Sequence, residues 1–479
     1  MEQKIKNIVT KLQQPDTAFA DVRITFTDYE SILFMNTNLK NYSNSPASPA
    51  IGIRVLIDGC FGFAGSKDLS DSSIERLIAK ARANARQGAK FQKEKVTFPA
   101  LPAAFGEYQH IPEIDPFALP KAEKLGYLKN LAEAIKPQAQ IVHSLVSAQF
   151  ERQEKYYANS EGSYSHSIVF NTLPLMLVVA AADSGIQTRT WPGHMSAGRG
   201  GFELFYKQQF EQNTERIIKE ATDLLHAPVI TDQKADIIIG AGHLALQLHE
   251  SVGHATEADR ILGQEISYAG KTFVKPEMLT NFKYGSDLVN IYSDSTDPRG
   301  LGYQPLDDEG VPGRRVDIIK NGILMDLQNS RHIAHKLGLQ PSANMKAPFA
   351  DDFPLVRMTN FCLAPGKGTL AELIANTEYG YYLDFTKTWS IDDNRNNFQF
   401  TTEIGYKIEH GKITGIVKEP TYYGITQEFW NACDAICGEE EWAYHSTFTC
   451  GKGEPGQIMR LSHGVAPARF KNINVSVKI

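Results

Sequence analysis

The segment LHESVGHATEAD, residues 248–259, constrains the backbone strongly because its two histidines, His249 and His254, are five residues apart. Each residue of a regular α-helix turns roughly 100°, so side chains four apart differ by about 40° and side chains five apart by about 140°. A regular helix therefore cannot direct both imidazoles toward one point. They converge only if one turn widens to a π-bulge or if the helix ends before His254. Gly253 makes either distortion less costly, because glycine tolerates unusual backbone angles.

Two converging imidazoles would form part of a metal site. If both bind Zn²⁺, Glu250 is not needed as a ligand and is free to take a proton from metal-bound water. A catalytic zinc site takes three protein ligands and leaves one position for water, so a third ligand must come from elsewhere. Glu257 and Asp259, one turn further along, and the distant cysteines are candidates. By itself, the motif leaves metal binding and an ordinary solvated helix as alternatives.

A different site overlaps this one. The sequence GAGHLA, residues 240–245, follows a short apolar strand predicted at 235–239 and fits the dinucleotide-binding fingerprint, with Asp259 and Glu265 as possible ribose ligands. The fingerprint needs a parallel second strand, but residues 266–287 are irregular and interrupted by proline. We therefore place a dinucleotide-binding oxidoreductase below the metal site and interpret the glycines as a tight turn between strand and helix.

Length and composition exclude several classes of protein. The 479 residues, 42% hydrophobic and 22% charged, are typical of a globular chain with more than one domain. The net charge of -6 gives no electrostatic reason to expect a nucleic acid or a membrane as a partner. The longest apolar run, residues 173–182, is about half as long as a membrane-spanning helix and predicts a buried strand.

The N-terminal sequence and the cysteines predict an intracellular protein. Residues 1–16 alternate lysine with apolar residues and lack the apolar core of a secretory signal, so we expect a cytoplasmic location. The five cysteines are odd in number and form no CxxC pair, which favours reduced thiols over a disulfide framework.

The pattern of apolar residues predicts an α+β fold of two lobes. In the N-terminal lobe, residues 1–228, we expect a mixed or antiparallel sheet and a possible sub-boundary in the Pro- and Phe-rich connector at 98–120. Residues 229–479 predict a sheet-rich C-terminal lobe that carries the HExxxH helix. The strands expected in the first lobe are 20–27, 51–57, 60–64, 141–149, 151–158, 163–170 and 173–182. The helices expected there are a segment capped within 70–73, 121–135 and 214–225. In the second lobe, hairpins are expected around Asn321-Gly322 and Gly411.

Many segments in one order resemble a known family, the TldD/PmbA metallopeptidases, and in particular its metal-bearing TldD type. The resembling segments are IGIRVLIDGCFGFAGSKDLS, YYANSEGSYSHS, GGFELF, LHESVGHATEADR, PLDDEGVPGRR, PLVRMTN, GITQEFW and CGKGEPGQ. Together they run through most of the chain, and they are far more specific than the His-Glu motif alone.

The resemblance implies a ligand set and an activity. The family's motifs fall on His249, His254 and Cys450 as ligands of one Zn²⁺ per chain, with Glu250 as the base. A thiolate and two neutral imidazoles would leave a net charge near +1, enough to activate water. The implied activity is hydrolysis of flexible peptides or unfolded small proteins with little sequence preference. Family members form homodimers, or heterodimers with a metal-lacking paralogue. A non-catalytic, metal-bearing regulatory subunit is the alternative, and a buried apolar role is the alternative for Cys450.

Further residues receive weaker assignments. Glu257 and Asp259 are expected to orient His254 through their carboxylates. The acidic turn at residues 307–310 is expected to be a solvated loop near the cleft. The four remaining cysteines are expected in the core, and Cys433 and Cys437, four residues apart, are expected on one face of a helix.

Overall fold

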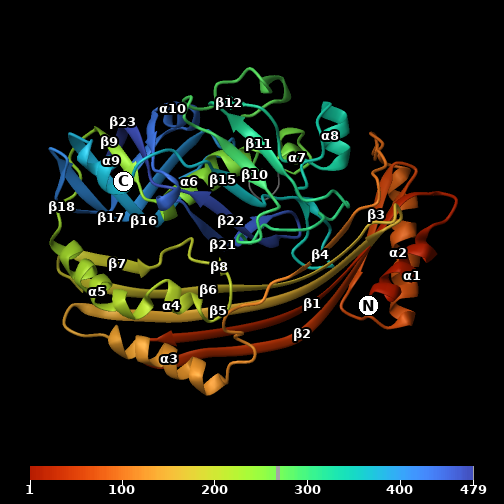
Figure 1. Cartoon of the computed structure of the whole chain (residues 1–479), viewed down its shortest axis with the longest axis horizontal. Helices are drawn as coiled ribbons and strands as arrows, with labels where there is room; N and C mark the ends of the chain where they lie inside the picture. The colour runs from red at the N-terminus through yellow and green to blue at the C-terminus, as the bar shows by residue number, and fades with distance from the viewer. Residues whose placement is uncertain (266–269, 478–479) are drawn as a thin grey trace.

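The computed structural model describes residues 1–265 and 270–477, and in it two layers are stacked (Figure 1). The lower layer is a long, curved sheet from the first half of the chain. The upper layer holds the remaining sheets and the segment that carries the two histidines. The mixture of helices with mostly antiparallel sheets confirms the predicted α+β class. Within the described residues, no helix has both the length and the apolar character needed to cross a bilayer.

The curved sheet has eight strands in the order β3-β2-β1-β5-β6-β4, with β7 and β8 also paired to β6. Its neighbours are antiparallel except for β4 and β6, which run parallel. The strands are β1 (Thr17–Met35), β2 (Asn38–Ile57), β3 (Cys60–Ser66), β4 (Phe105–Gln109), β5 (Ile141–Asn159), β6 (Tyr164–Ala182), β7 (Gly185–Trp191) and β8 (Gly198–Arg199). β4 lies within the segment expected to be only a connector, which corrects that prediction.

Two pairs of predicted strands are in fact single strands. The expected break near Phe150 and Glu151 is absent, because β5 and β6 stay paired along almost their whole length. The composition changes there because the apolar core that packs against one face of β5 ends at Phe150, and the polar residues Arg152 and Glu154 follow on that face. Glu151 and Lys155 lie on the opposite face and line a cavity beneath the C-terminal layer. A change in surroundings therefore resembled a strand end.

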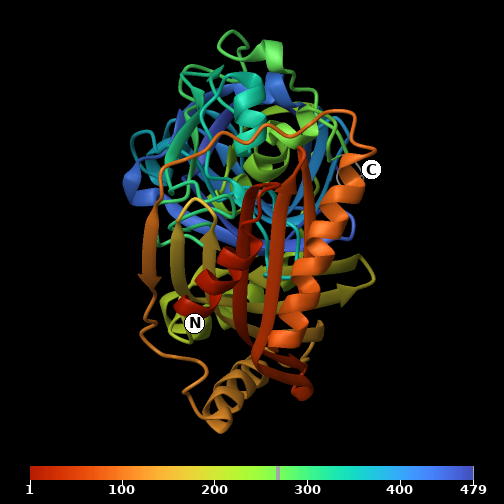
Figure 2. The same cartoon turned by 90° about the vertical axis from the view of Figure 1, so that its right-hand side faces the viewer.

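Helices cover both ends of the curved sheet (Figure 2). At one end lie α1 (Glu2–Leu12) and α2 (Asp71–Ala89), and the side chain of Ser70 accepts a hydrogen bond from the Ser73 amide at 3.3 Å, which confirms the predicted cap. At the other end lie α3 (Lys121–Ala134), α4 (Leu204–Lys207) and α5 (Phe210–His226). All strands of the curved sheet precede residue 228, but the division into two domains there stays a prediction.

The upper layer contains a six-stranded sheet and a seven-stranded sheet. The first has the order β12-β11-β10-β15-β22-β21. Its strands are β10 (Ile291–Asp294), β11 (Arg315–Lys320), β12 (Ile323–Leu324), β15 (Asn360–Leu363), β21 (Ala443–Lys452) and β22 (Gln457–Val465). The second has the order β16-β9-β23-β19-β17-β18, and a further pairing of β16 with β17 closes five of its strands into a ring. Its strands are β9 (Lys234–Ile239), β16 (Tyr379–Ile391), β17 (Asn397–Glu409), β18 (Lys412–Lys418), β19 (Pro420–Ile425), β20 (Cys433–Ile436) and β23 (Ala468–Val477).

Shorter elements connect these sheets. They are the paired strands β13 (Met345–Lys346) and β14 (Leu355–Val356), and the helices α6 (Ala241–Leu248), α7 (Ala258–Ile261), α8 (Arg331–Leu337), α9 (Leu370–Ala375) and α10 (Thr426–Asn431). Both predicted hairpins form, since β11 and β12 flank Asn321-Gly322 and β17 and β18 flank Gly411.

Two local predictions in this layer were wrong. Cys433 lies in strand β20 and pairs with Phe470, and helix α10 ends before it. A spacing of four places side chains on one face of a strand as well as of a helix, so the spacing alone could not decide. The core position was right, because Cys433 and Cys437 are both buried, as are Cys60 and Cys362.

The acidic turn is also not a solvated loop. Asp307, Asp308 and Glu309 are at most 2% exposed. The turn joins the two layers, because Lys155 of β5 forms an ion pair with Asp308 at 2.5 Å and Arg331 donates its backbone N–H to Glu309 at 2.7 Å. The cations that compensate these carboxylates are distant in the sequence. The acidic turn was therefore predicted to be exposed, because no local pattern shows its partners.

Candidate metal centre

The backbone distorts at the residue where the spacing of the histidines requires it. Helix α6 passes into a π-helical turn over His249–Gly253, and a 3-10 turn follows over His254–Thr256. This confirms the predicted widening. Gly253 is needed for packing as well, because a Cβ atom on it would lie 2.2 Å from the sulfur of Met358. A side chain at position 253 would therefore require Met358 to move.

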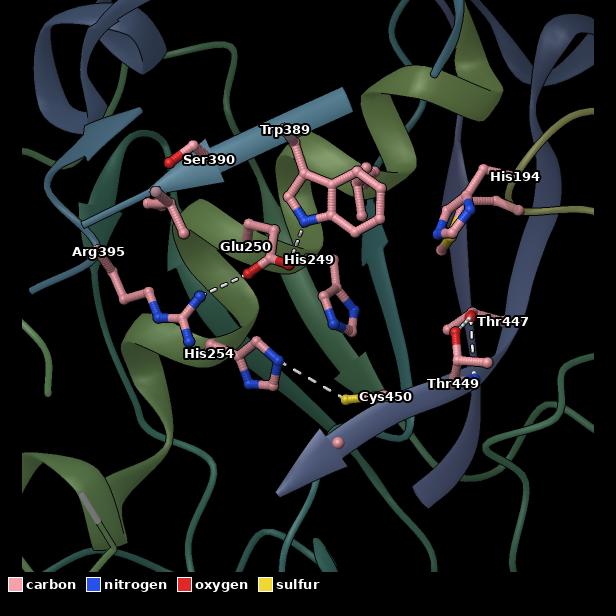
Figure 3. A pocket seen from close by; sticks show the side chains of 14 residues that line it. His194, His249, Glu250, His254, Trp389, Ser390, Arg395, Thr447, Thr449 and Cys450 are labelled. Atoms are coloured by element: carbon pink, nitrogen blue, oxygen red, sulfur yellow. Dashed lines mark hydrogen bonds and ion pairs between the residues drawn. The ribbon is translucent and has the colours of Figure 1, made fainter. Parts of the chain in front are cut away.

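The widened turn brings both imidazoles together with a thiol from the far end of the chain (Figure 3). One side-chain ligand atom from each of His249, His254 and Cys450 lies within 4.8 Å of the other two. Nε2 of His254 lies 3.6 Å from the sulfur of Cys450. That distance matches the roughly 3.6 Å between a nitrogen and a sulfur that share one tetrahedral zinc ion. All three residues are buried, and their donor set fits a zinc-like ion.

Hydrogen bonds fix the tautomer of His249. Nδ1 of His463 contacts the carbonyl of Phe361 at 2.8 Å, and a carbonyl only accepts, so this nitrogen carries the proton. Burial holds the pKa of His463 well below its ordinary value, so its Nε2 keeps a lone pair. That lone pair accepts the proton of Nδ1 of His249 at 2.9 Å. Nε2 of His249 is therefore left with a lone pair for a metal, and burial lowers the pKa of His249 to about 4.

A carboxylate fixes the tautomer of His254 in the same way. Nδ1 of this ring donates to Oε2 of Glu257 at 3.0 Å, which leaves Nε2 as the lone-pair nitrogen. Glu257 also accepts from Arg260 at 2.7 Å and lies 3.2 Å from the ammonium of Lys452. Although burial opposes its ionisation, Lys452, His254 and Arg260 hold its pKa well below the usual range. Asp259 does not take the expected position, because its carboxylate binds Lys452 at 2.8 Å instead of His254.

The thiol of Cys450 is adjusted toward the thiolate. Burial alone would raise its pKa, but Arg357 and His254 outweigh that effect and lower it. Arg357 also donates a hydrogen bond to the backbone carbonyl of Cys450. A bulge in β21 between Thr447 and Cys450 sets the position of the sulfur.

Glu250 lies beside the cluster with an ionised carboxylate. It accepts a hydrogen bond from Nε1 of Trp389 at 3.1 Å and from Arg395 at 2.5 Å, and its side chain is 12% exposed. Burial raises its pKa, but the neighbouring His249 and His254 and the charge of Arg395 together lower it. The carboxylate therefore lies ionised at the cavity wall.

His249, Glu250, His254 and Cys450 line a cavity of about 320 Å³. Strand β16 forms one wall with Trp389 and Ser390, and β21 forms the opposite wall with Thr447 and Thr449. His194 comes from the first half of the chain and faces the cavity from the side away from Arg395, with its ring 4.9 Å from that of Trp389 (Figure 3). A hydrogen bond of 3.1 Å from the Ser446 amide to the Met195 carbonyl attaches this loop to β21.

Sequence reasoning missed most of the residues around the cluster. They are His194, Trp389, Arg395, Arg357 and Lys452, and His463 was noticed only as part of the C-terminal segment. None of them belongs to a short motif with metal-ligand spacing, and each reaches the site from a separate strand or loop. Arg357 and Lys452 lie within the resembling segments PLVRMTN and CGKGEPGQ, which could have marked them, and the register of the β21 and β22 hairpin places His463 opposite His445.

The dinucleotide alternative gains no support from the glycine turn. Gly240 caps α6, and a Cβ atom on it would lie 2.4 Å from the carboxylate carbon of Asp384, so a protein carboxylate already approaches the start of the helix. The parallel neighbour of β9 is β16, about 140 residues further along the chain. Residues 266–269 of the segment considered for a second strand lie outside the described residues.

Comparison with known families covers nearly the whole chain. Models of the PmbA/TldA metallopeptidases, the family called TldD/PmbA above, match in three parts. The model of domain 1 matches residues 20–85, that of the central domain matches residues 114–227, and that of the C-terminal domain matches residues 232–477.

Individual relatives agree along their full length. The chain is 28% identical over 463 residues to a metalloprotease of Methanothermobacter thermautotrophicus, covering 95% of each protein. It is 24% identical over 479 residues to the zinc metalloprotease TldD homolog of Saccharolobus solfataricus, covering 98% of each.

Solved structures share the fold. A proposed modulator of a DNA gyrase from Thermotoga maritima has a TM-score of 0.76 at 18% identity, over 99% of this chain and 100% of that one. TldE from Thermococcus kodakarensis has a TM-score of 0.69 at 16% identity, over 99% of this chain and 100% of that one.

Proposed function

From the premise that the chain belongs to the PmbA/TldA (TldD/PmbA) family of metallopeptidases, we propose that it is a zinc-dependent peptidase. It would hydrolyse peptide bonds of flexible peptides or unfolded small proteins with little sequence preference. One observation carries this proposal: His249, His254 and Cys450 meet in one cavity beside the ionised carboxylate of Glu250.

The three converging residues would hold one zinc ion per chain. Two neutral imidazoles with Nε2 lone pairs and one acidified thiol match the nitrogen and sulfur ligands that zinc prefers. When bound, such an ion would supply Lewis acidity toward a carbonyl oxygen and lower the pKa of a water. The hydrogen bonds from His249 to His463 and from His254 to Glu257 keep the two rings oriented toward the site.

Glu250 would act as the general base. Its carboxylate takes the proton of the attacking water and later returns it to the leaving amine. Arg395 and Trp389 hold the carboxylate in place through both of its oxygens. Because Arg395 lowers the basicity of Glu250, it also keeps the carboxylate ionised and ready to accept a proton.

His194 would act from the opposite wall. A tetrahedral intermediate carries negative charge on the former carbonyl oxygen, and a hydrogen-bond donor across from the base stabilises that charge. His194 faces the cavity from the side away from Arg395 (Figure 3). The loop that carries it is hydrogen-bonded to β21, the strand of Cys450.

The walls of the cavity suggest how peptides of many sequences would bind. Strand β16 pairs with β9 only through residues 380–383, and within the described residues no strand pairs with the cavity side of residues 388–391. An extended peptide can form main-chain hydrogen bonds with such an edge whatever its side chains are. This agrees with low sequence specificity.

The proposed peptidase would work as a dimer, either with a second copy or with a metal-lacking paralogue. The similarity of the fold to TldE from Thermococcus kodakarensis supports a partner of that type. The cytoplasmic location expected from the N-terminal sequence stays a prediction.

A regulatory role is the second candidate. It is favoured by the structural relatives described as proposed modulators of DNA gyrase. In this case the metal would be structural, and another subunit would perform any chemistry.

The test is metal content and peptide hydrolysis measured on the same preparation of the purified chain. The peptidase predicts about one zinc per chain and hydrolysis of an unstructured protein that a chelator abolishes and zinc restores. Bound zinc without hydrolysis, in the homodimer and with a metal-lacking paralogue added, would favour the regulatory role.

A further inference from the structure

A second cavity, remote in sequence from the metal ligands, lies between the two layers of the molecule. We call it the interlayer cavity. It measures about 60 Å³. Strands β5, β6 and β8 of the curved sheet line it, together with residues 301, 303–306, 346–348 and 459–460 of the upper layer. In Figure 1, β5 and β6 pass below β21 and β22 in this region. Its charged residues are Glu151, Lys155, Arg199, Lys346 and Arg460.

Two of its four cations are compensated by carboxylates. Lys155 binds Asp308 at 2.5 Å, and Arg460 binds Glu151 at 2.7 Å. Within residues 1–265 and 270–477, no carboxylate oxygen lies within 4 Å of the side-chain nitrogens of Arg199 or Lys346. The cavity therefore carries an excess of two positive charges when both residues are protonated.

The hydrogen bonds of these two cations are incomplete as well. Arg199 donates to the side chain of Asn171 at 2.8 Å and to the Gly300 carbonyl at 3.0 Å, but its Nε is buried without an acceptor from the protein. Among the described residues, the only acceptor within hydrogen-bond distance of the ammonium of Lys346 is the Leu301 carbonyl, at a long 3.4 Å. An ammonium has three hydrogens to donate, so this one retains donor capacity.

Unpaired cations in such a place are costly. Withdrawing an ion from water without a counter-charge is unfavourable, and proteins avoid this by pairing the ion or by releasing its proton. Burial, together with the charges of Lys155 and Arg199, lowers the pKa of Lys346 to about 7. Burial also lowers the pKa of Arg199 to about 10. A negatively charged ligand would remove this cost.

We propose that the interlayer cavity binds a small oxyanion between Lys346 and Arg199. The small volume limits the ligand to a few non-hydrogen atoms, and the hydroxyl groups of Ser165 and Ser167 line the same cavity as further donors. Phosphate, sulfate and a small carboxylate share the required chemistry, which is two or more oxygens that carry negative charge. The site is independent of the proposed peptidase activity.

Such an anion would join the two layers. Arg199 belongs to β8 of the curved sheet, and Lys346 belongs to β13 of the upper layer. A ligand that binds both therefore favours the stacked arrangement over the unfolded chain, and the folded state gains stability as the ligand concentration rises.

The experiment is thermal unfolding of the full chain titrated with phosphate, sulfate or acetate, with sodium chloride at matched ionic strength as the reference. At least one oxyanion is expected to raise Tm in a saturable way, and the same dissociation constant should appear in isothermal titration calorimetry. If phosphate and sulfate act and acetate does not, the site takes an inorganic anion. The reverse order indicates a carboxylate.

The variant Lys346→Met removes the ammonium and keeps most of the apolar stem. Its dissociation constant for the active oxyanion should be at least about tenfold larger, since a charge-assisted hydrogen bond is lost. The exposed Lys80→Met on α2 is the matched control and should bind as the wild type does. Equal binding by wild type and Lys346→Met overturns the proposal, as does a Tm rise that chloride reproduces. If Lys346→Met does not fold, Arg199→Gln takes its place. Calorimetry on the wild type is decisive in either case: if none of the three anions at millimolar concentration produces binding heat, the proposed site is wrong.

Discussion

Nδ1 of His249 lies 2.9 Å from Nε2 of His463, and this contact decides which nitrogen of His249 is available to a metal. His463 is anchored in turn by the Phe361 carbonyl at 2.8 Å. The order of donors and acceptors runs in one direction, from the carbonyl through two rings to the site. A residue 214 positions away in the sequence therefore sets the chemistry of a motif residue.

We expect His463→Ala to weaken zinc binding by about tenfold to a hundredfold, because the acceptor that orients His249 is lost. Competition with a chromophoric chelator measures the affinity. His445→Ala is the matched control, since His445 is a partly buried histidine that pairs with His463 across β21 and β22, and among the described residues it has no hydrogen bond with His249. Equal zinc affinity in both variants would contradict an orienting role for His463.

Glu250→Gln should retain zinc and lose peptide cleavage by a factor of about a hundred to ten thousand, because an amide cannot accept the proton. The side chain keeps its shape and a carbonyl oxygen that accepts from Trp389 or Arg395. The measurements are metal content and kcat on an unstructured protein. Full cleavage by this variant would remove Glu250 from the mechanism.

Cys450→Ala should lower zinc occupancy strongly, since the thiolate is the only anionic group in the cluster of three. Cys433→Ala, which removes a buried thiol from a strand away from the cluster, is the control and should keep its zinc. Zinc is measured by elemental analysis after dialysis against a weak chelator. Cys450 would not be a ligand if both variants lose zinc to the same extent.

His194→Ala should lower kcat while zinc content and KM stay close to those of the wild type, because the ring would act on charge that develops in the transition state. The affinity for a phosphinic peptide, which carries a tetrahedral anion, should fall in parallel with kcat/KM. His194→Gln, which keeps an N–H donor, should recover part of both. A rise in KM alone would instead assign His194 to substrate binding.

The stability of the wild type should rise with pH between about 7 and 10.5 through Lys346. In the folded protein the pKa of Lys346 is lowered to about 7 from 10.5, so across this window the unfolded chain holds a proton that the folded chain has released. Stability then increases by at most about 1.4 kcal/mol per pH unit from this residue, and the effect is constant below pH 7.

Lys346→Met should lack this slope and should be more stable than the wild type near neutral pH. Denaturant unfolding in buffers free of oxyanions tests both statements. Parallel pH profiles for the two proteins would show that Lys346 keeps an ordinary pKa in the folded state.

Several elements could be predicted because their signals are local. Alternating residues placed β1, β2 and β3, and the Ser70 cap placed the start of α2, since each depends on neighbours a few residues apart. The five-residue spacing of His249 and His254 predicted a widened turn or a helix end by geometry alone, and the structure shows the widened turn. Cys450 entered through a resemblance, because no local pattern connects it to the histidines.

The sequence by itself determined the α+β class, a distortion of the backbone between His249 and His254, and, with the family resemblance, the three candidate metal ligands. Only the tertiary structure decided their surroundings: that the acidic turn at Asp308 is buried against Lys155, and that His463 orients His249. The physical reason is that these contacts join residues about 150 to 215 positions apart. Burial and protonation depend on such partners, and a local pattern contains neither.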